Sequence, residues 1–287
     1  MLNYESTLSR MLKALPDLKN FHHRHGLTYQ MLDEVALEAA DSIFGESGPQ
    51  ALVLEDLGAL KLPFLSMGEI KSTHLFGLDE LIIFSFYLKN KNRYKKVFDI
   101  GANIGLHSII LAKADFDVVS YEPDPWHFKI LQDNLELNSV TSKVSPRNKA
   151  VSTSVGELEF IRVLDNTTGS HLAGAKKDPY GELERFNVNV DAFKDIMKAA
   201  DLLKIDVEGH ESKLILSSEK SDWVGTDAIV EIGTPENAKL IFEYMQNIGV
   251  NLYSQKKSWL KVDALADMPT SYKEGSLFIS LDSSMPW

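Results

Sequence analysis

The stretch from Lys96 to Gly105 constrains the fold more than any other part of the chain. It reads KVFDIGANIG, so an apolar run ends at Gly101, a second glycine follows four residues later, and a helical pattern of apolar residues then begins. This order predicts a buried strand, a tight turn and a helix that starts at the second glycine. The glycines let the backbone approach a ligand where a Cβ atom would collide, and the helix start offers free N–H groups.

An acidic residue follows this turn at the distance typical of a ribose-binding side chain. Glu122 lies 21 residues after Gly101, at the end of the next apolar run, Val118 to Tyr121. In doubly wound folds an acid at about this spacing hydrogen-bonds the ribose hydroxyls. The turn and Glu122 together predict a binding site for a nucleoside cofactor.

Asp99, just before the turn, indicates which nucleoside is bound. The dinucleotide fingerprint G-x-G-x-x-G is not matched, because Asn103 stands where the middle glycine is expected. Beside a pyrophosphate Asp99 would add like-charge repulsion, whereas a cationic sulfonium and its α-amine would be attracted to it. The charge of this residue favours S-adenosylmethionine over a nicotinamide dinucleotide.

Strands and helices alternate from Lys95 onward, which predicts a parallel sheet flanked by helices. The expected strands are 96–100, 117–122, 143–148, 201–206, 227–232, 251–255 and 276–281. The expected helices are 104–114, 125–137, 191–199, 211–220 and 235–248. Only loop sequence separates the last two strands, so we expect them to be antiparallel neighbours, which an ordinary dinucleotide fold lacks.

Two regions lie outside this alternation. Residues 1–90 predict an amino-terminal appendage, mainly helical, with a short β-hairpin that turns at 56–58. Residues 91–287 form the expected nucleoside-binding domain, which residues 152–190 interrupt. This insertion holds two β-like runs around a polar loop, 165–181, and so long a loop is usually functional or disordered.

Four stretches of the sequence resemble the FkbM family of S-adenosylmethionine-dependent methyltransferases. They are DIGANIGLHS at 99–108, YEPDP at 121–125, LQDNLELN at 131–138 and KIDVEGHE at 204–211. The resemblance covers residues 95–281 and does not extend to the first ninety residues. It implies a class I methyltransferase fold, with a doubly wound, mostly parallel, seven-stranded sheet. It also implies, as is usual in the family, O-methylation of a hydroxyl on a sugar, polysaccharide or secondary metabolite.

Candidate catalytic residues follow the fourth and fifth expected strands, because ligands of doubly wound sheets collect at the carboxyl ends of the strands. Asp206 ends the fourth strand, Glu208 and His210 come directly after it, and Glu231 lies at the end of the fifth. Asp206 or Glu208 could accept the hydroxyl proton, or His210 could do so if a carboxylate orients it. Glu211 is expected to cap the following helix.

The residues expected to contact the cofactor come from the turn and from the neighbouring strand ends. They are Asp99, Gly101, Ala102, Asn103, Gly105, Glu122, Pro123, Asn148, Ala150 and Asp206. Asn148 could read the adenine edge or only shape a turn. Glu80, in the first turn of a helical run at 75–88, is expected to stabilise that helix start, the alternative being a contact with the cofactor.

A metal ion is a further option at the same strand ends. Asp206 and Glu231 could hold magnesium, which would bind an acceptor diol and lower the pKa of its hydroxyl. Two acids from neighbouring strand ends are also common without a metal, so no metal ligand is assigned.

Composition excludes several other classes of protein. The chain has no cysteine, which excludes disulfides and thiolate sites and suits a reducing cytoplasm. A net charge of −11 argues against bulk binding of nucleic acid. Glu5 and Arg10 interrupt what would be the apolar part of a signal peptide, and the apolar run 81–88 is too short to span a bilayer. We therefore expect a cytoplasmic enzyme with a small-molecule or glycan substrate, one that could oligomerise through its amino-terminal region.

Three other functions compete with O-methylation. The same motifs would support N-methylation of a small-molecule amine. A cofactor-binding scaffold without activity is disfavoured because Asp99, Glu122 and Asp206 are all present. A nicotinamide oxidoreductase is disfavoured by the charge of Asp99 and by the expected antiparallel strand at the end of the chain.

Overall fold

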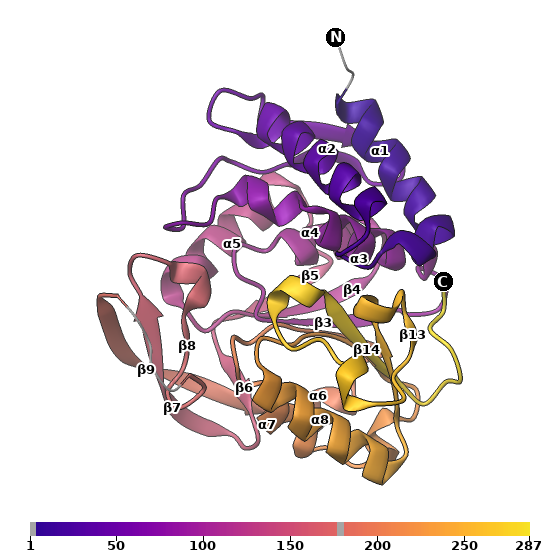
Figure 1. Ribbon diagram of the computed structural model, residues 1–287. Helices are drawn as coiled ribbons and strands as arrows, with labels where there is room; N and C mark the ends of the chain where they lie inside the picture. The colour runs from indigo at the N-terminus through magenta and orange to yellow at the C-terminus, as the bar shows by residue number, and fades with distance from the viewer. Residues whose placement is uncertain (1–3, 177–180) are drawn as a thin grey trace.

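A large mixed sheet forms the centre of the molecule in the computed structural model, which describes residues 4–176 and 181–287 (Figure 1). Its strand order is β13-β12-β14-β11-β10-β3-β4-β5. The strands are β3 (Lys96–Ile100), β4 (Asp117–Tyr121), β5 (Val144–Arg147), β10 (Leu202–Ile205), β11 (Asp227–Glu231), β12 (Asn251–Ser254), β13 (Leu260–Lys261) and β14 (Ser276–Ser280). The protein therefore has the expected α/β fold of class I methyltransferases.

The strand directions confirm the expected topology. Strands β5, β4, β3, β10 and β11 run parallel, and β14 lies antiparallel between β11 and β12. The expected number of seven strands was wrong by one, because Leu260 and Lys261 pair with β12 and add an eighth strand at the edge. Two residues are too few for a hydrophobic period to reveal.

Helices cover both faces of the sheet because successive residues of each strand point to opposite sides. Leu202 belongs to the core on one face, and Leu203 belongs to the core on the other. Helices α4 (Leu106–Lys113) and α5 (Pro125–Leu137) pack on the first face. Helices α6 (Phe193–Met197), α7 (Glu211–Leu216) and α8 (Pro235–Ile248) pack on the second (Figure 1).

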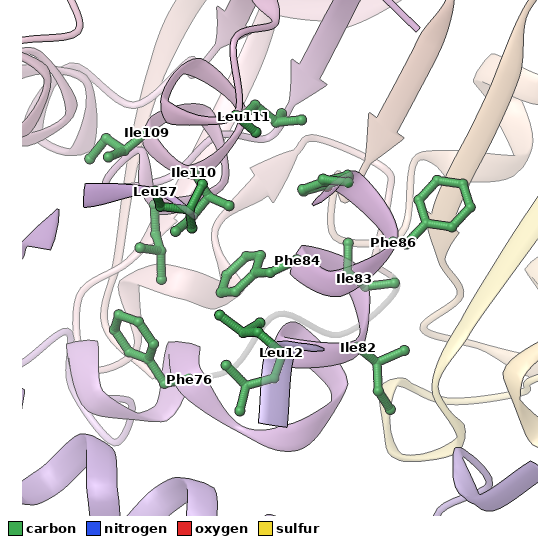
Figure 2. Packing of buried hydrophobic residues seen from close by; sticks show 14 of the residues in the cluster. Leu12, Leu57, Phe76, Ile82, Ile83, Phe84, Phe86, Ile109, Ile110 and Leu111 are labelled. Atoms are coloured by element: carbon green, nitrogen blue, oxygen red, sulfur yellow. The ribbon is translucent and has the colours of Figure 1, made fainter. Parts of the chain in front are cut away.

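The amino-terminal region packs on the same face as α4 and α5. It consists of α1 (Tyr4–Ala14), α2 (Leu27–Phe44), β1 (Ala51–Leu54), β2 (Gly58–Lys61) and α3 (Leu78–Lys89). Strands β1 and β2 pair antiparallel, which confirms the expected hairpin. A single buried cluster joins these elements to the sheet, and Figure 2 shows Leu12, Phe76 and Phe84 of this region beside Ile110 of α4.

Aromatic contacts of α3 fix this region on the sheet. The rings of Phe86 on α3 and Phe278 on β14 lie 5.6 Å apart, and Phe86 is fully buried. Burial of one such side chain stabilises the fold by about 1.5–3 kcal/mol. Helix α3 is therefore held in the layer next to α4, close to the turn that follows β3.

The outer face of α2 carries exposed apolar side chains. Leu27, Met31 and Val35 lie at four-residue spacing and are 78%, 68% and 40% exposed. Oligomerisation through this region stays a prediction. Across residues 4–176 and 181–287, no helix has the length and apolar character needed to cross a membrane.

The insertion forms a second, smaller sheet. Its strands are β6 (Ala150–Ser152), β7 (Gly156–Val163), β8 (His171–Leu172) and β9 (Leu183–Ala192), in the order β6-β9-β7-β8 (Figure 1). The two expected β-like runs are confirmed as β7 and β9, which pair antiparallel. The expected polar loop 165–181 is interrupted by a 3-10 turn at Thr167–Gly169 and by β8. Its residues 177–180 lie outside the described part of the chain.

Candidate functional site

The turn after β3 lies directly against the end of β10. Gly101 has a φ of +85°, and its N–H and that of Ala102 donate to the carbonyl oxygen of Tyr121 at 3.0 and 2.9 Å. A Cβ atom on Gly101 would lie 1.7 Å from the carbonyl oxygen of Asp206. Gly105, with a φ of +88°, begins α4. Only glycine allows this approach, so the turn and Asp206 are neighbours because the sequence has no side chain at position 101.

Glu122 is fixed beside the turn by two backbone N–H groups. Its Oε2 accepts from Asn103 and its Oε1 accepts from Asp124, both at 2.8 Å. Burial raises the pKa of Glu122 to about 8, with the charge of Asp124 adding to the rise and the two amide bonds opposing it. Each carboxylate oxygen has a second lone pair, so both can still accept a hydrogen bond from a ligand hydroxyl.

Two buried acceptor oxygens near the turn lack a donor. Asp99 is fully buried, and its Oδ2 accepts from the hydroxyl of Ser108 at 2.6 Å. Its Oδ1 and the Oδ1 of Asn103 are shielded from solvent and accept no hydrogen bond from the described residues. Buried acceptors without donors are uncommon in folded proteins. These two fit a ligand that brings N–H or O–H groups to the turn.

The candidate residues after β4 and β5 mainly shape the backbone. The Nδ2 of Asn148 donates to the carbonyl oxygens of Glu122 and Pro123, at 2.9 and 3.0 Å. These bonds agree with the turn-shaping role considered for Asn148, and its contact with the adenine stays a prediction. Ala150 is buried at the start of β6, and Asp124 caps α5 by accepting from the N–H of Trp126.

Four acidic side chains gather at the carboxyl ends of β10 and β11, and we refer to them as the acidic cluster. They are Glu80, Asp206, Glu208 and Glu231. Burial raises the pKa of Glu231 far above its usual range, and the charges of Asp206, Glu80 and Glu208 add to the rise. The side chains of Glu80 and Asp206 nevertheless stay 30% exposed. The cluster is therefore crowded by protein but still accessible to a ligand.

Lys204 supplies a positive charge within this group. It lies on β10, where its backbone pairs with that of Asp99, and its Nζ donates to Oδ2 of Asp206 at 3.1 Å. Burial would lower the pKa of Lys204, but the charges of Asp206, Asp99, Glu80 and Glu231 raise it above its usual range. The signal for this pairing in the sequence is a lysine inside a buried strand, two residues before an acid. Among residues 4–176 and 181–287, no three His, Cys, Asp or Glu side chains are arranged to hold a metal ion.

His210 and Glu208 face the insertion. The Nε2 of His210 lies 2.9 Å from the hydroxyl of Ser152 on β6, and burial lowers the pKa of His210 to about 4. No carboxylate is its hydrogen-bond partner among the described residues. Glu208 accepts from Nζ of Lys176 at 2.7 Å.

Glu211 was expected to cap α7. Its side chain instead shapes the loop between β10 and α7. Its Oε1 accepts from the N–H groups of Val207 and Gly209, at 3.2 and 3.0 Å, and its Oε2 accepts from Asn237 at 2.7 Å. These bonds hold the segment that carries Glu208 and His210.

Glu80 lies in the first turn of α3, as expected, but its side chain makes no capping hydrogen bond there. Its Oε2 lies 2.8 Å from Nε2 of His107, whereas the N–H of Leu78 at the helix start donates to Asp33. Nδ1 of His107 lies 3.0 Å from the hydroxyl of Tyr87. Burial alone would raise the pKa of Glu80, but His107 and Lys204 outweigh it and lower the pKa. Glu80 thus belongs to the site as an ionised side chain.

Two segments that are distant in sequence meet above the acidic cluster, and we call residues 66–71 and 165–176 the roof. The N–H of Thr167 donates to the carbonyl oxygen of Met67 at 3.1 Å. A Cβ atom on Gly68 would lie 1.8 Å from the carbonyl oxygen of Asp165. Lys176 then connects the roof to the cluster, because its Nζ donates both to Gly169 and to Glu208.

A separate depression of about 720 Å³ lies at the other end of the parallel strands, where they begin. Arg93, Lys143 and Asp227 are among the residues that line it, and they come just before or at the start of parallel strands. Its charges neutralise one another, since Arg93 pairs with Asp227 at 3.1 Å and Lys143 with Asp115 at 2.9 Å. This depression therefore has none of the chemistry described above.

Comparisons with known proteins found one matching family model and a relative of low sequence identity. The model of the methyltransferase FkbM domain matches residues 99–252. The methyltransferase sdnD of Sordaria araneosa is 22% identical over 197 residues, which are 57% of this chain and 76% of that protein.

Two solved structures are similar to parts of the chain. The methyltransferase FkbM from Methylobacillus flagellatus aligns with a TM-score of 0.41 and 17% identity, over 65% of this chain and 44% of that one. A SAM-dependent methyltransferase from Agrobacterium tumefaciens aligns with a TM-score of 0.41 and 11% identity, over 81% and 70% of the two chains. The similarity to the first structure thus spans less than half of its length.

Proposed function

The chain belongs to the FkbM family of S-adenosylmethionine-dependent methyltransferases, and from this premise we propose that it methylates a hydroxyl group of a sugar, polysaccharide or secondary metabolite. The observation that carries the proposal is the contact between Gly101 and the backbone of Asp206. This contact makes the cofactor-binding turn and the candidate base direct neighbours. A chain without cysteine suits the reducing cytoplasm, where we propose that the enzyme acts.

The residues present fit the cofactor. The carboxylate of Glu122 would hold the ribose hydroxyls, and the unpaired oxygens of Asp99 and Asn103 would receive N–H groups. When bound, S-adenosylmethionine supplies a methyl group on a cationic sulfonium. The acidic cluster attracts a cation because its four carboxyl groups outnumber the two ammonium groups beside it, those of Lys204 and Lys176.

We propose that Asp206 is the base that takes the proton from the hydroxyl group to be methylated. Lys204 holds Oδ2 of Asp206 at 3.1 Å, while Oδ1 accepts no hydrogen bond from the described residues and is free to receive the proton. Glu208 is paired with Lys176, and the buried Nε2 of His210 is occupied by Ser152. Burial raises the pKa of Glu231 and so favours its protonated form, in which it can donate a hydrogen bond to the acceptor oxygen.

N-methylation is the second candidate function. The excess of carboxyl groups at the ends of β10 and β11 also suits an acceptor with a cationic amine. Parallel incubations of the enzyme and labelled cofactor with fractions rich in hydroxyl compounds or in amines distinguish the two, with mass spectrometry to detect the methylated product.

Cofactor binding tests the proposal through Glu122. Wild-type protein is expected to bind S-adenosylhomocysteine and not NAD in titration calorimetry. Glu122→Ala is expected to weaken binding by about 1.5–3 kcal/mol, because both hydrogen bonds from the ribose hydroxyls are lost. Glu34→Ala, on the exposed face of α2, is the control with the same loss of charge. Unchanged affinity in Glu122→Ala would refute the ribose assignment, and wild type that prefers NAD would refute the proposed function.

We propose that residues 1–90 act as a region that shapes the acceptor site of the methyltransferase domain, 91–287. The support is the roof, in which residues 66–71 meet the loop of the insertion above the acidic cluster. The amino-terminal region and the insertion would therefore both border the space beside Asp206 and Glu208.

Opening the roof should affect the acceptor and not the cofactor. Gly68→Ala adds a Cβ atom that would lie 1.8 Å from Asp165 at a φ of +95°, so the two segments must separate. We expect faster hydrogen exchange at Thr167 and a KM for the acceptor about tenfold higher, which is about 1.4 kcal/mol. Gly58→Ala is the control, because Gly58 also has a positive φ but no atom within 4 Å. Faster exchange with an unchanged KM would show that the roof does not border the acceptor.

A further inference from the structure

Three hydrogen-bonded side chains connect α3 to the start of α4. Burial and the charges of Asp99 and Glu80 raise the pKa of Tyr87, so its hydroxyl keeps the proton. Glu80 is ionised and can only accept, so Nε2 of His107 carries the hydrogen between them. Nδ1 of His107 lies 3.0 Å from the hydroxyl of Tyr87, which keeps its proton and can donate it to this nitrogen. The chain of donors runs from Tyr87 through His107 and ends on Glu80, which it holds as a carboxylate.

The second oxygen of this carboxylate is available to a ligand. Oε1 of Glu80 accepts no hydrogen bond from residues 4–176 and 181–287, and the side chain is 30% exposed. The charges of Asp99 and Glu80 both raise the pKa of Lys204 and that of Tyr87, so the two carboxyl groups lie near the same side chains. Asn103, in the turn four residues before His107, also has an unpaired oxygen. Three acceptor oxygens beside the turn therefore lack donors.

We propose that Glu80 binds the α-ammonium group of the methionine part of the cofactor. The inference rests on the proposed function. A primary ammonium brings three N–H donors and one positive charge, which matches the unpaired acceptors and the ionised carboxylate. The sulfonium has no N–H, and a hydroxyl ligand brings one donor and no charge. Asp99 is fully buried and the side chain of Glu80 is 30% exposed, so Glu80 is the more accessible of the two acids.

Two ligands that differ in the amino-acid part test the assignment. S-adenosylhomocysteine contains it, whereas 5′-methylthioadenosine has the same adenosine and thioether without the ammonium and carboxylate. Glu80→Gln keeps the size of the side chain and an oxygen for His107 but removes the charge. In titration calorimetry we expect this variant to bind S-adenosylhomocysteine about tenfold or more weakly, and to bind 5′-methylthioadenosine within about twofold of wild type.

Two further variants make the result specific. Glu122→Ala should weaken both ligands, because both contain the ribose. Glu34→Gln, on the exposed face of α2, should change neither. The inference is overturned if Glu80→Gln leaves S-adenosylhomocysteine binding unchanged or weakens both ligands equally. Wild-type protein that bound neither ligand would overturn the proposed function, and the inference with it.

Discussion

Replacing Asp206 by asparagine is expected to lower the rate of methyl transfer by roughly 100-fold or more while cofactor affinity changes little. The substitution keeps the shape of the side chain. It also leaves one oxygen that can accept a hydrogen bond from Lys204, whose Nζ lies 3.1 Å from Oδ2 of Asp206 in the wild type. It removes the charge and most of the basicity. The proton of the acceptor then has no base at the end of β10.

The measurement is single-turnover transfer from labelled cofactor to the acceptor, combined with calorimetry for S-adenosylhomocysteine. Glu208→Gln is the matched variant two residues away, and it should lower the rate less than about tenfold. If Asp206→Asn loses cofactor affinity in proportion to its rate, Asp206 holds the methionine end instead. If the variant keeps full activity, Glu208 becomes the candidate base.

A chelator should leave the wild-type rate unchanged in the same assay. The ammonium of Lys204 already lies among Asp206, Asp99, Glu80 and Glu231, where a cation would otherwise be expected. Loss of activity with EDTA and its return with magnesium would contradict this view. Asp206 and Glu231 would then be metal ligands.

Replacing Gly101 by alanine is expected to lower the free energy of unfolding by about 2–4 kcal/mol and to weaken cofactor binding by about 100-fold or more. Gly101 has a φ of +85°, which costs energy for any residue with a Cβ. The new atom would also lie 1.7 Å from the carbonyl oxygen of Asp206, so the turn and β10 must move apart. The movement displaces the backbone on both sides of the proposed cofactor site.

Gly225→Ala separates these two causes. Gly225 has a φ of +80° but no atom within 4 Å of an added Cβ, so its substitution adds backbone strain without a collision. We expect about 1–2 kcal/mol of destabilisation and unchanged cofactor affinity. Denaturant unfolding and calorimetry measure both variants. Equal effects in Gly101→Ala and Gly225→Ala would show that the close approach to Asp206 is not required.

The central sheet could be predicted because its signals are local. Strands β3, β4, β10 and β11 are each a short apolar run followed by a helix, and the missing helix before β14 indicated its antiparallel direction. Two glycines at a fixed spacing predict the turn after β3 in the same way. Such patterns depend only on neighbours along the chain.

The role of Glu80 could not be predicted, because it depends on how two helices pack. An acid in the first turn of a helix is equally consistent with stabilising that helix start. Glu80 and His107 are 27 residues apart, and only the docking of α3 beside α4 brings them to 2.8 Å. The roof depends on packing even more strongly, since Met67 and Thr167 are separated by 100 residues.

Lys204 is an intermediate case. Residues two apart on a strand face the same side, so its pairing with Asp206 could be inferred from the sequence. Asp99 and Glu231 also raise the pKa of Lys204, but their proximity follows from the register of β3, β10 and β11, which the sequence does not show. The effect of Glu80 depends on where α3 packs. The sequence therefore indicated one partner of this lysine, while the structure shows four acidic neighbours.

The position of α3 has a consequence for recombination between relatives of this enzyme. A chimaera that joins a foreign amino-terminal region at residue 90 would replace Glu80 and Tyr87 while keeping His107. It would also replace Phe86 and leave Phe278 against an unmatched surface. A junction just before Leu78 retains both pairs of contacts. In exchanges of acceptor specificity, α3 should therefore be inherited together with the sheet.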